Sequence, residues 1–141
     1  MITIIDYGMG NLRSIQNALD FLGVESRLVR AADSIRRADK LVLPGVGAFQ
    51  KAMSNLRNEQ LQPAILDAVR EGTPLFGICL GMQLLAERGE EGGPMSGLGL
   101  IRGTVKRFQV SDDLRVPHMG FNEVEFVRPH PFFAGIEDKS H

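Results

Sequence analysis

The chain has 141 residues, of which 43% are hydrophobic and 23% charged, and 16 Lys and Arg nearly balance 17 Asp and Glu to give a formal charge of -1. This apolar content excludes a disordered chain, and the charge balance excludes a nucleic-acid binder that relies on a basic surface. A chain of this length can bury a core, so we expect one globular domain over residues 1–141.

Cysteine and histidine content limits the other classes. A single cysteine, Cys79, excludes an internal disulfide, and one cysteine with three histidines is too little for a structural zinc site. We expect no metal and no cofactor. Because no basic leader precedes an apolar segment, and no window approaches the roughly 18 apolar residues of a membrane helix, we expect a soluble cytoplasmic protein without a membrane partner.

Strands and helices alternate through the first ninety or so residues. We expect strands at 2–5, 24–29, 41–43 and 74–78, and helices at 12–22, 34–38, 49–56, 63–72 and 82–88. Later residues predict a glycine-rich surface loop at 90–99, an extended segment at 101–108, a half-exposed strand at 123–127 and an irregular stretch from Pro129. This order predicts a three-layer α/β sandwich with a mainly parallel sheet and crossover helices.

Three glycine-containing loops follow strands of this sheet. They begin at Asp6, Pro44 and Ile78. Since the carboxyl ends of parallel strands meet at one edge of a sheet, we expect the loops to converge there.

Gly77-Ile78-Cys79-Leu80-Gly81 has the form of a nucleophile elbow with sulfur in place of the usual hydroxyl. A sharp strand-to-helix turn needs small residues on each side of the nucleophile, and a helix N-terminus favours the thiolate. The alternative is that Cys79 is a buried core residue. The paired glycines and the strand-to-helix context favour the nucleophile.

Pro44-Gly45-Val46-Gly47 could present backbone N–H groups to a developing oxyanion, as acyl transfer requires. Gln83 stands one helical turn after Cys79, where its amide could contact a substrate. Taken alone, the loop is more typical of a plain turn and Gln83 of a solvated helix residue. Together with the elbow, they indicate acyl chemistry. A dinucleotide fingerprint at Gly8-Met9-Gly10 is disfavoured because position 13 is arginine.

Four segments then carry a resemblance to a known family. They are Asp6-Tyr7-Gly8-Met9-Gly10-Asn11-Leu12, Leu43-Pro44-Gly45-Val46-Gly47-Ala48-Phe49, Gly77-Ile78-Cys79-Leu80-Gly81-Met82-Gln83 and Val116-Pro117-His118-Met119-Gly120-Phe121-Asn122. In order and spacing they resemble the glutaminase subunits of imidazole glycerol phosphate synthase, which are class I (triad) glutamine amidotransferases of histidine biosynthesis. The first and last segments are the most specific to these subunits.

The resemblance implies a mechanism and a partner. Cys79 would form a glutamyl thioester with glutamine, backbone N–H groups of the 45–47 loop and of Leu80 in the elbow would stabilise the oxyanion, and Gln83 would hold substrate. Ammonia would pass to a (β/α)8-barrel synthase subunit, in a heterodimer that makes imidazole glycerol phosphate and AICAR. The implied interface residues are Gly10, Asn11, His118, Met119 and Phe121.

The chain departs from the family in two places. Phe121 replaces the usual tryptophan, and the Phe-His-Pro-Glu motif that carries the family's catalytic His and Glu does not occur. His118 lies in the interface motif, and His130, between two prolines, is more typical of a surface loop than of a base. We therefore expect a C-terminally truncated form whose own glutaminase activity is near zero.

Three other interpretations stay open. The first is an interaction module that keeps the docking surface near Asn11 and His118 and performs no chemistry. The second is another amidotransferase branch, such as the glutaminase of pyridoxal phosphate synthesis, against which the segment from Asp6 to Leu12 argues. The third is a redox or chaperone protein of related fold that uses an elbow cysteine.

Overall fold

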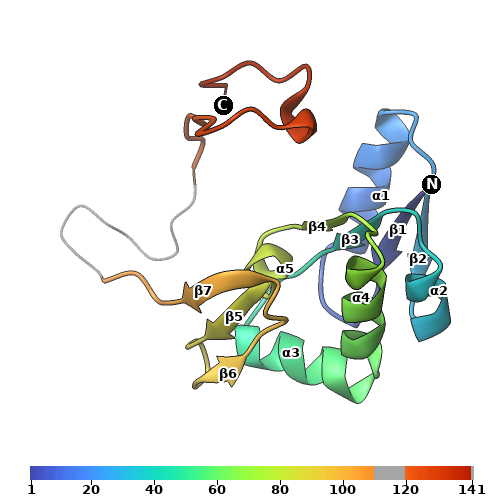
Figure 1. Ribbon diagram of the computed structural model, residues 1–141, viewed down its shortest axis with the longest axis vertical. Coiled ribbons are helices and arrows are strands. Elements are labelled where there is room, and N and C mark those ends of the chain that lie inside the picture. Colours follow the sequence, from blue (N-terminus) through green and yellow to red (C-terminus); the bar gives the residue numbers. More distant parts are fainter. Residues whose placement is uncertain (110–119, 141) are drawn as a thin grey trace. The chain divides into compact units, whose positions relative to one another are not determined.

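The structure is a computed structural model that describes residues 1–109 and 120–140 (Figure 1). Two compact units make up the chain, Met1–Arg107 and Phe108–His141, and each is described by itself. Within the described ranges, no helix is both long enough and apolar enough to cross a bilayer.

The first unit alternates strands and helices and ends in a second, smaller sheet (Figure 1). In chain order its elements are β1 (Ile2–Ile5), α1 (Leu12–Phe21), β2 (Ser26–Val29), α2 (Ala32–Arg36), β3 (Leu41–Leu43), α3 (Phe49–Asn58), α4 (Leu61–Arg70), β4 (Leu75–Gly77), α5 (Leu80–Gln83), β5 (Ala86–Gly89), β6 (Met95–Ser96) and β7 (Ile101–Val105).

The main sheet has the strand order β2-β1-β3-β4, and every neighbouring pair is parallel. From β1 the chain moves to one side to reach β2, and from β2 it moves back across β1 to reach β3. Right-handed crossovers therefore place α1 on one face of the sheet and α2, α3 and α4 on the other. The predicted three-layer α/β class with a mainly parallel sheet is confirmed.

The core lies between the sheet and the second of these helical layers. Alternate strand residues Ile5, Leu41 and Leu43 point into it. Opposite them lie apolar side chains of α2, α3 and α4, namely Ile35, Phe49, Ala52, Met53, Leu56, Leu61, Ala64, Ile65 and Ala68. By contrast α1 has no buried residue, although its predicted amphipathic pattern does form a half-buried face. The buried core that supports the loops therefore lies mainly on the face of the sheet covered by α2, α3 and α4.

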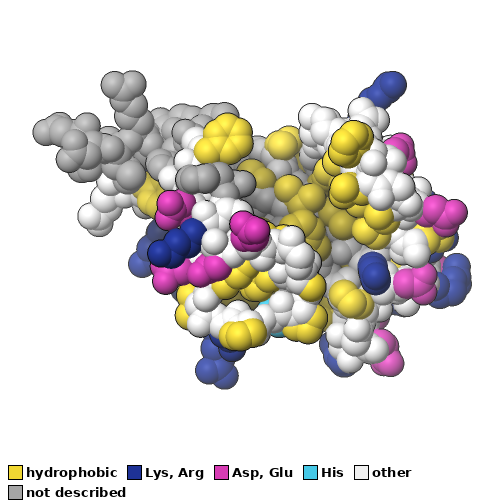
Figure 2. All heavy atoms as spheres, turned by 90° about the horizontal axis from the view of Figure 1, so that it is seen from above, with side chains coloured by type: hydrophobic (Ala, Val, Ile, Leu, Met, Phe, Trp, Pro, Cys, Tyr) yellow, Lys and Arg dark blue, Asp and Glu magenta, His cyan; other side chains and the backbone are white. Residues whose placement is uncertain are grey.

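The surface of the molecule carries both signs of charge. Figure 2 shows acidic and basic side chains intermixed on the face that it draws, which agrees with the formal charge of -1. We expect no large region of positive or of negative electrostatic potential on such a surface.

The helix predicted over 82–88 is confirmed only at residues 82 and 83 and is wrong after Gln83. The helix α5 ends at Gln83, and Ala86–Gly89 forms β5, which pairs antiparallel with β6 and parallel with β7. A Cβ at Gly89 would lie 2.5 Å from the ring of Phe49, so the chain passes closely over this buried ring. The apolar run that resembled a helix face instead supplies two consecutive buried residues, Leu84 and Leu85.

The glycine-rich stretch 90–99 is more than a surface loop. It contains β6, and Leu98 is buried in the main core. The carboxylate of Glu91 accepts a hydrogen bond from the N–H of Phe49 at 3.1 Å, at the first residue of α3. The extended segment predicted at 101–108 is confirmed for the five residues of β7.

In the second unit the described residues form turns. The strand predicted at 123–127 is wrong. Val124 makes one isolated antiparallel bridge to Ser140, and the described residues around it do not extend this bridge into a ladder. Phe126 stacks on Phe133 with ring centroids 4.2 Å apart, next to a single 3-10 turn, Pro131–Phe133. An alternating pattern forms a strand only where a neighbour completes its hydrogen bonds, and only one such bridge is found among the described residues.

Candidate active site

Cys79 lies in a strained turn directly after β4. Its backbone has φ 53° and ψ -117°, which a residue with a side chain rarely adopts, and its side chain is exposed. The predicted sharp turn is therefore confirmed. The alternative that Cys79 is a buried core residue is wrong.

The elbow is in backbone contact with the end of β3. A Cβ at Gly81 would overlap the carbonyl oxygen of Leu43, and one at Gly45 would lie 2.6 Å from the backbone nitrogen of Gly81. The N–H of Ile78 also donates to the Leu43 oxygen at 3.0 Å. Since neither Gly81 nor Gly45 leaves room for a side chain, the Cys79 turn and the Pro44–Gly47 loop lie directly against each other.

The loop that follows β3 has a buried and an exposed half. Pro44 and Gly45 are buried, whereas Val46 and Gly47 are exposed. In the described part of the chain, the backbone N–H groups of Val46 and Leu80 have no hydrogen-bond acceptor. Such N–H groups beside a nucleophile can donate to an oxyanion, as the sequence predicted for this pair of loops.

The loop after β1 completes the cluster. A Cβ at Gly10 would lie 2.9 Å from Cβ of Pro44, and one at Gly47 would lie 3.0 Å from Cε of Met9. The loops after β1, β3 and β4 therefore meet at one edge of the sheet, as predicted from the parallel strand order.

Tyr7 connects these loops, a role that was not predicted from the sequence. Its buried hydroxyl donates to the carbonyl oxygen of Pro44 at 2.8 Å, and its own carbonyl oxygen accepts from Nδ2 of Asn55 at 3.1 Å. Burial raises the pKa of the Tyr7 hydroxyl well above its usual value, and the charge of a nearby Cys79 thiolate raises it further. Tyr7 thus remains a protonated donor close to the nucleophile. The sequence feature from which this role could have been predicted is an aromatic residue with a polar hydroxyl inside a glycine loop.

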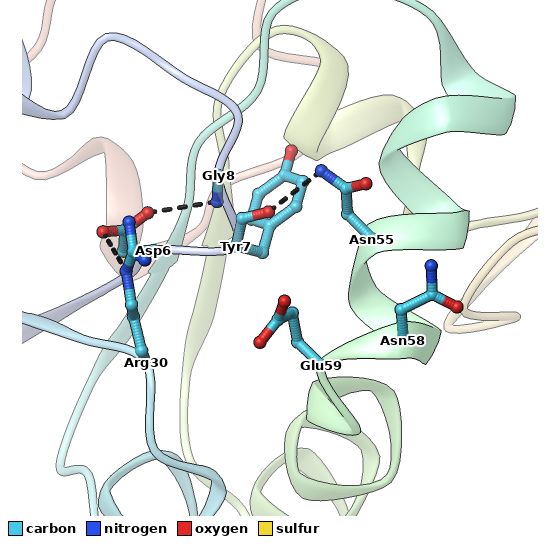
Figure 3. Close-up of a pocket in the computed structure, with 7 residues that line it drawn as sticks. All are labelled: Asp6, Tyr7, Gly8, Arg30, Asn55, Asn58 and Glu59. Carbon is cyan, nitrogen blue, oxygen red and sulfur yellow. Dashed lines mark hydrogen bonds and ion pairs between the residues drawn. The ribbon is translucent and has the colours of Figure 1, made fainter.

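A polar pocket of about 160 Å³ opens on the backbone side of Tyr7 (Figure 3). Within it, Asp6 accepts from Nε of Arg30 at 2.8 Å and from the N–H of Gly8 at 3.1 Å. The hydrogen bond and charge of Asp6 raise the pKa of the Arg30 guanidinium. These bonds fix the start of the loop after β1, because they join it to the end of β2.

The remaining predicted residues divide into three groups. Gln83 is half-buried, and its N–H bonds to the Cys79 carbonyl oxygen at 3.2 Å, one helical turn from the sulfur-bearing residue as predicted. Asn11 is exposed, and its side chain accepts from the N–H of Ser14 at 3.3 Å, so it caps α1. His118 and Met119 lie outside the described residues.

Phe121 and His130, which were considered from the sequence, lie among the described residues of the second unit. Phe121 is 94% exposed. The Nδ1 atom of His130 accepts from the N–H of Phe132 at 3.1 Å, and its ring meets the edge of Phe133. These contacts make His130 the cap of a short turn, in line with the surface-loop interpretation.

Comparison with known proteins agrees with this geometry. The sequence profile of the class-I glutamine amidotransferase family matches residues 3–140. A chain described as imidazole glycerol phosphate synthase subunit HisH from Geobacillus kaustophilus is 49% identical over 142 residues, with 98% of this chain and 67% of that protein covered. The HisH subunit of Symbiobacterium thermophilum is 50% identical over 135 residues, covering 96% of this chain and 63% of that protein. The present chain therefore spans about two thirds of the length of these relatives.

A solved structure gives the same result for the fold. The crystal structure of a glutamine amidotransferase superposes with a TM-score of 0.65 and 26% sequence identity, covering 75% of this chain and 56% of that one. Together with the profile match and the relatives that share about half of their residues with this chain, this structure shows that the chain belongs to the class-I glutamine amidotransferase family, in the branch of the imidazole glycerol phosphate synthase subunits HisH.

Proposed function

We propose that this chain carries the nucleophile half of a glutaminase. The single observation that supports it most is the exposed, strained Cys79, held directly against a glycine loop whose Val46 N–H has no acceptor among residues 1–109 and 120–140. Glutamine is the proposed substrate because the chain shares the family of the class-I glutamine amidotransferases.

The proposed chemistry follows from these positions. The Cys79 sulfur attacks the side-chain amide carbon of glutamine, and the oxyanion that forms receives hydrogen bonds from N–H groups of the 45–47 loop and of Leu80. Gln83, one turn further along α5, holds the substrate. The carbon–nitrogen bond then breaks, and the leaving nitrogen takes up the proton that the Cys79 thiol released and departs as ammonia. The glutamyl thioester that remains reacts with water to give glutamate and the free thiol.

The proposed partner is the (β/α)8-barrel synthase subunit that consumes the ammonia in histidine biosynthesis. We propose that Gly10, Asn11, His118, Met119 and Phe121 contribute to this heterodimer interface, since the relatives are named as subunits of a synthase. A cytoplasmic location is proposed as well, because a free thiol that acts as nucleophile persists in reducing compartments.

Covalent labelling tests the nucleophile. A diazoketone analogue of glutamine should alkylate Cys79 of the 141-residue chain with saturable kinetics, and glutamine should protect the thiol. Cys79→Ser removes the label and serves as the control. Labelling that glutamine does not slow would reject glutamine as the substrate, and labelling no faster than that of a small-molecule thiol would reject the active-site assignment.

A catalytically incomplete docking form is the second candidate, and one observation favours it. All three histidines follow residue 107, so the unit that holds Cys79 contains none, and a cysteine nucleophile ordinarily needs a histidine to carry the proton. Under this candidate, glutamate release stays at background with and without the barrel subunit, while the two chains still co-purify. Glutamate release above background that requires Cys79 would exclude it.

A further inference from the structure

The loop proposed to stabilise the oxyanion is held at both ends by side chains from elsewhere in the fold. At its start, the buried Pro44 carbonyl oxygen accepts the Tyr7 hydroxyl at 2.8 Å. At its end, the N–H of Phe49 donates to Glu91 at 3.1 Å, where α3 begins. Between these two points, the exposed Val46 and Gly47 form no hydrogen bond with a side chain of the described residues.

The first of these attachments determines the direction of the next donor. A peptide unit is planar and trans, so its C=O and the following N–H point in opposite directions. When the Pro44 oxygen is fixed toward Tyr7, the N–H of Gly45 is fixed away from it. Gly47 is exposed and has φ 98°, a conformation open mainly to glycine, so without this bond the exposed half of the loop has alternatives.

Tyr7 is itself held in place. Its carbonyl oxygen accepts from Asn55 of α3 (Figure 3), and the residue as a whole is 2% exposed. The loop that bears it is joined to β2 by the Asp6–Arg30 pair. A rigid, buried donor of this kind can hold a carbonyl in one orientation at little entropic cost, since its own freedom is already lost.

We propose that Tyr7 is a positioning residue whose hydroxyl keeps the 45–47 loop in the orientation that receives the oxyanion. The inference rests on the proposed glutaminase function and extends it to a residue that does not touch substrate. Tyr7→Phe removes only the hydroxyl and leaves the ring in the core, so it isolates this bond.

The experiment uses a substrate that needs no proton donor. The γ-(p-nitrophenyl) ester of glutamate acylates a cysteine with release of nitrophenolate, which leaves with the electron pair of the broken carbon–oxygen bond. The rapid first release of nitrophenolate, the burst, therefore measures the rate of attack by Cys79 and the stabilisation of the oxyanion in the 141-residue chain. Cys79→Ser sets the background rate.

Tyr7→Phe should lower the limiting acylation rate about 10-fold, a fraction of the roughly 10²–10³ that removal of a whole oxyanion donor costs. The half-saturation concentration should change by less than about twofold, because ground-state binding is not the target. A limiting rate equal to that of the parent chain would overturn the inference, as would a change confined to half-saturation.

Thr73→Val is the matched control. The Thr73 hydroxyl also donates to a backbone carbonyl, that of Ala38 at 3.3 Å, and lies in the loop between α4 and β4. The Thr73→Val variant should lower the melting temperature about as much as Tyr7→Phe does and should leave the burst rate unchanged. An equal fall in acylation would show that general loosening explains the effect, and would overturn the inference.

A second variant covers the case in which Tyr7→Phe does not fold. Asn55→Ala removes the donor to the Tyr7 carbonyl oxygen and should lower the limiting rate about threefold. An unchanged rate in that variant overturns the inference. If the parent chain shows no burst above Cys79→Ser, the proposed function itself fails, which the kinetics of the parent alone reveal.

Discussion

The two parts of the chain that carry the family's motifs differ in what holds them. Around Cys79, three loops are pressed together so closely that Gly10, Gly45 and Gly81 leave no room for a side chain. Among the described residues 120–140, by contrast, no side chain is fully buried, and the contacts are aromatic ring contacts around Phe133, hydrogen bonds within turns and a single bridge. The nucleophile is therefore positioned by the core of residues 1–107. Its geometry depends on the packing of this core as well as on the residues of the motif.

Removal of a core ring should show the largest difference between the two parts. Phe49 is 0% exposed and packs against Gly89, so Phe49→Ala should lower the free energy of unfolding by about 3–5 kcal/mol. Phe121→Ala removes the same ring from a position that is 94% exposed and should change it by less than about 0.5 kcal/mol. Denaturant unfolding followed by circular dichroism measures both. Equal effects would contradict the comparison.

An added methyl group tests the close approach of the loops. Gly81→Ala forces a Cβ onto the Leu43 carbonyl oxygen, so the free energy of unfolding should fall by about 3 kcal/mol and labelling of Cys79 should slow. Gly120→Ala meets no atom within 4 Å and should be neutral. If Gly81→Ala unfolds and labels like the parent chain, the elbow is not held by this contact.

Periodicity and glycine placement were sufficient to predict most of the first unit. Short apolar runs followed by glycines identified β1, β3 and β4, and the strand–helix alternation predicted the parallel sheet and the converging loops. The turn at Cys79 was predictable because the small neighbours Gly77 and Gly81 have a steric purpose there. In each of these cases the local sequence pattern and the tertiary packing favour the same structure.

Prediction failed where tertiary contacts decide the local structure. Residues 86–89 have no strong strand pattern, and they are extended because they pair with β6 and β7 while Gly89 passes over Phe49. The alternating residues 123–127 lack such a partner among the described residues. Tyr7 was missed for a similar reason, since its acceptor, Pro44, is 37 residues away in the sequence.

The second attachment of the oxyanion loop should have a moderate effect. Ala48, at the N-cap of α3, makes no side-chain capping bond, and Glu91 supplies the acceptor from the loop before β6. Glu91→Ala should therefore cost about 1 kcal/mol of the free energy of unfolding, as loss of a helix cap does. Glu125→Ala, an exposed carboxylate of the second unit, should cost less than about 0.5 kcal/mol. Equal values for the two variants would show that Glu91 does not cap α3.

The smallest expected effect is a pH-dependent one, at Asp67 of α4. Hydrogen bonds from Arg36 and Arg70 lower the pKa of Asp67 below its ordinary value of 3.8. A lowered pKa in the folded state means that the ionised carboxylate stabilises the fold above that ordinary value, and that this contribution is lost as the pH falls through the lowered one. The melting temperature of the parent chain should therefore slightly exceed that of Asp67→Asn at about pH 6, and the two should converge below about pH 4. Because these three side chains are exposed, about 1 M salt should also reduce the difference. A difference that persists unchanged in acid and in salt would show that Asp67 joins α2 to α4 by shape and hydrogen bonding alone, and that its charge adds nothing.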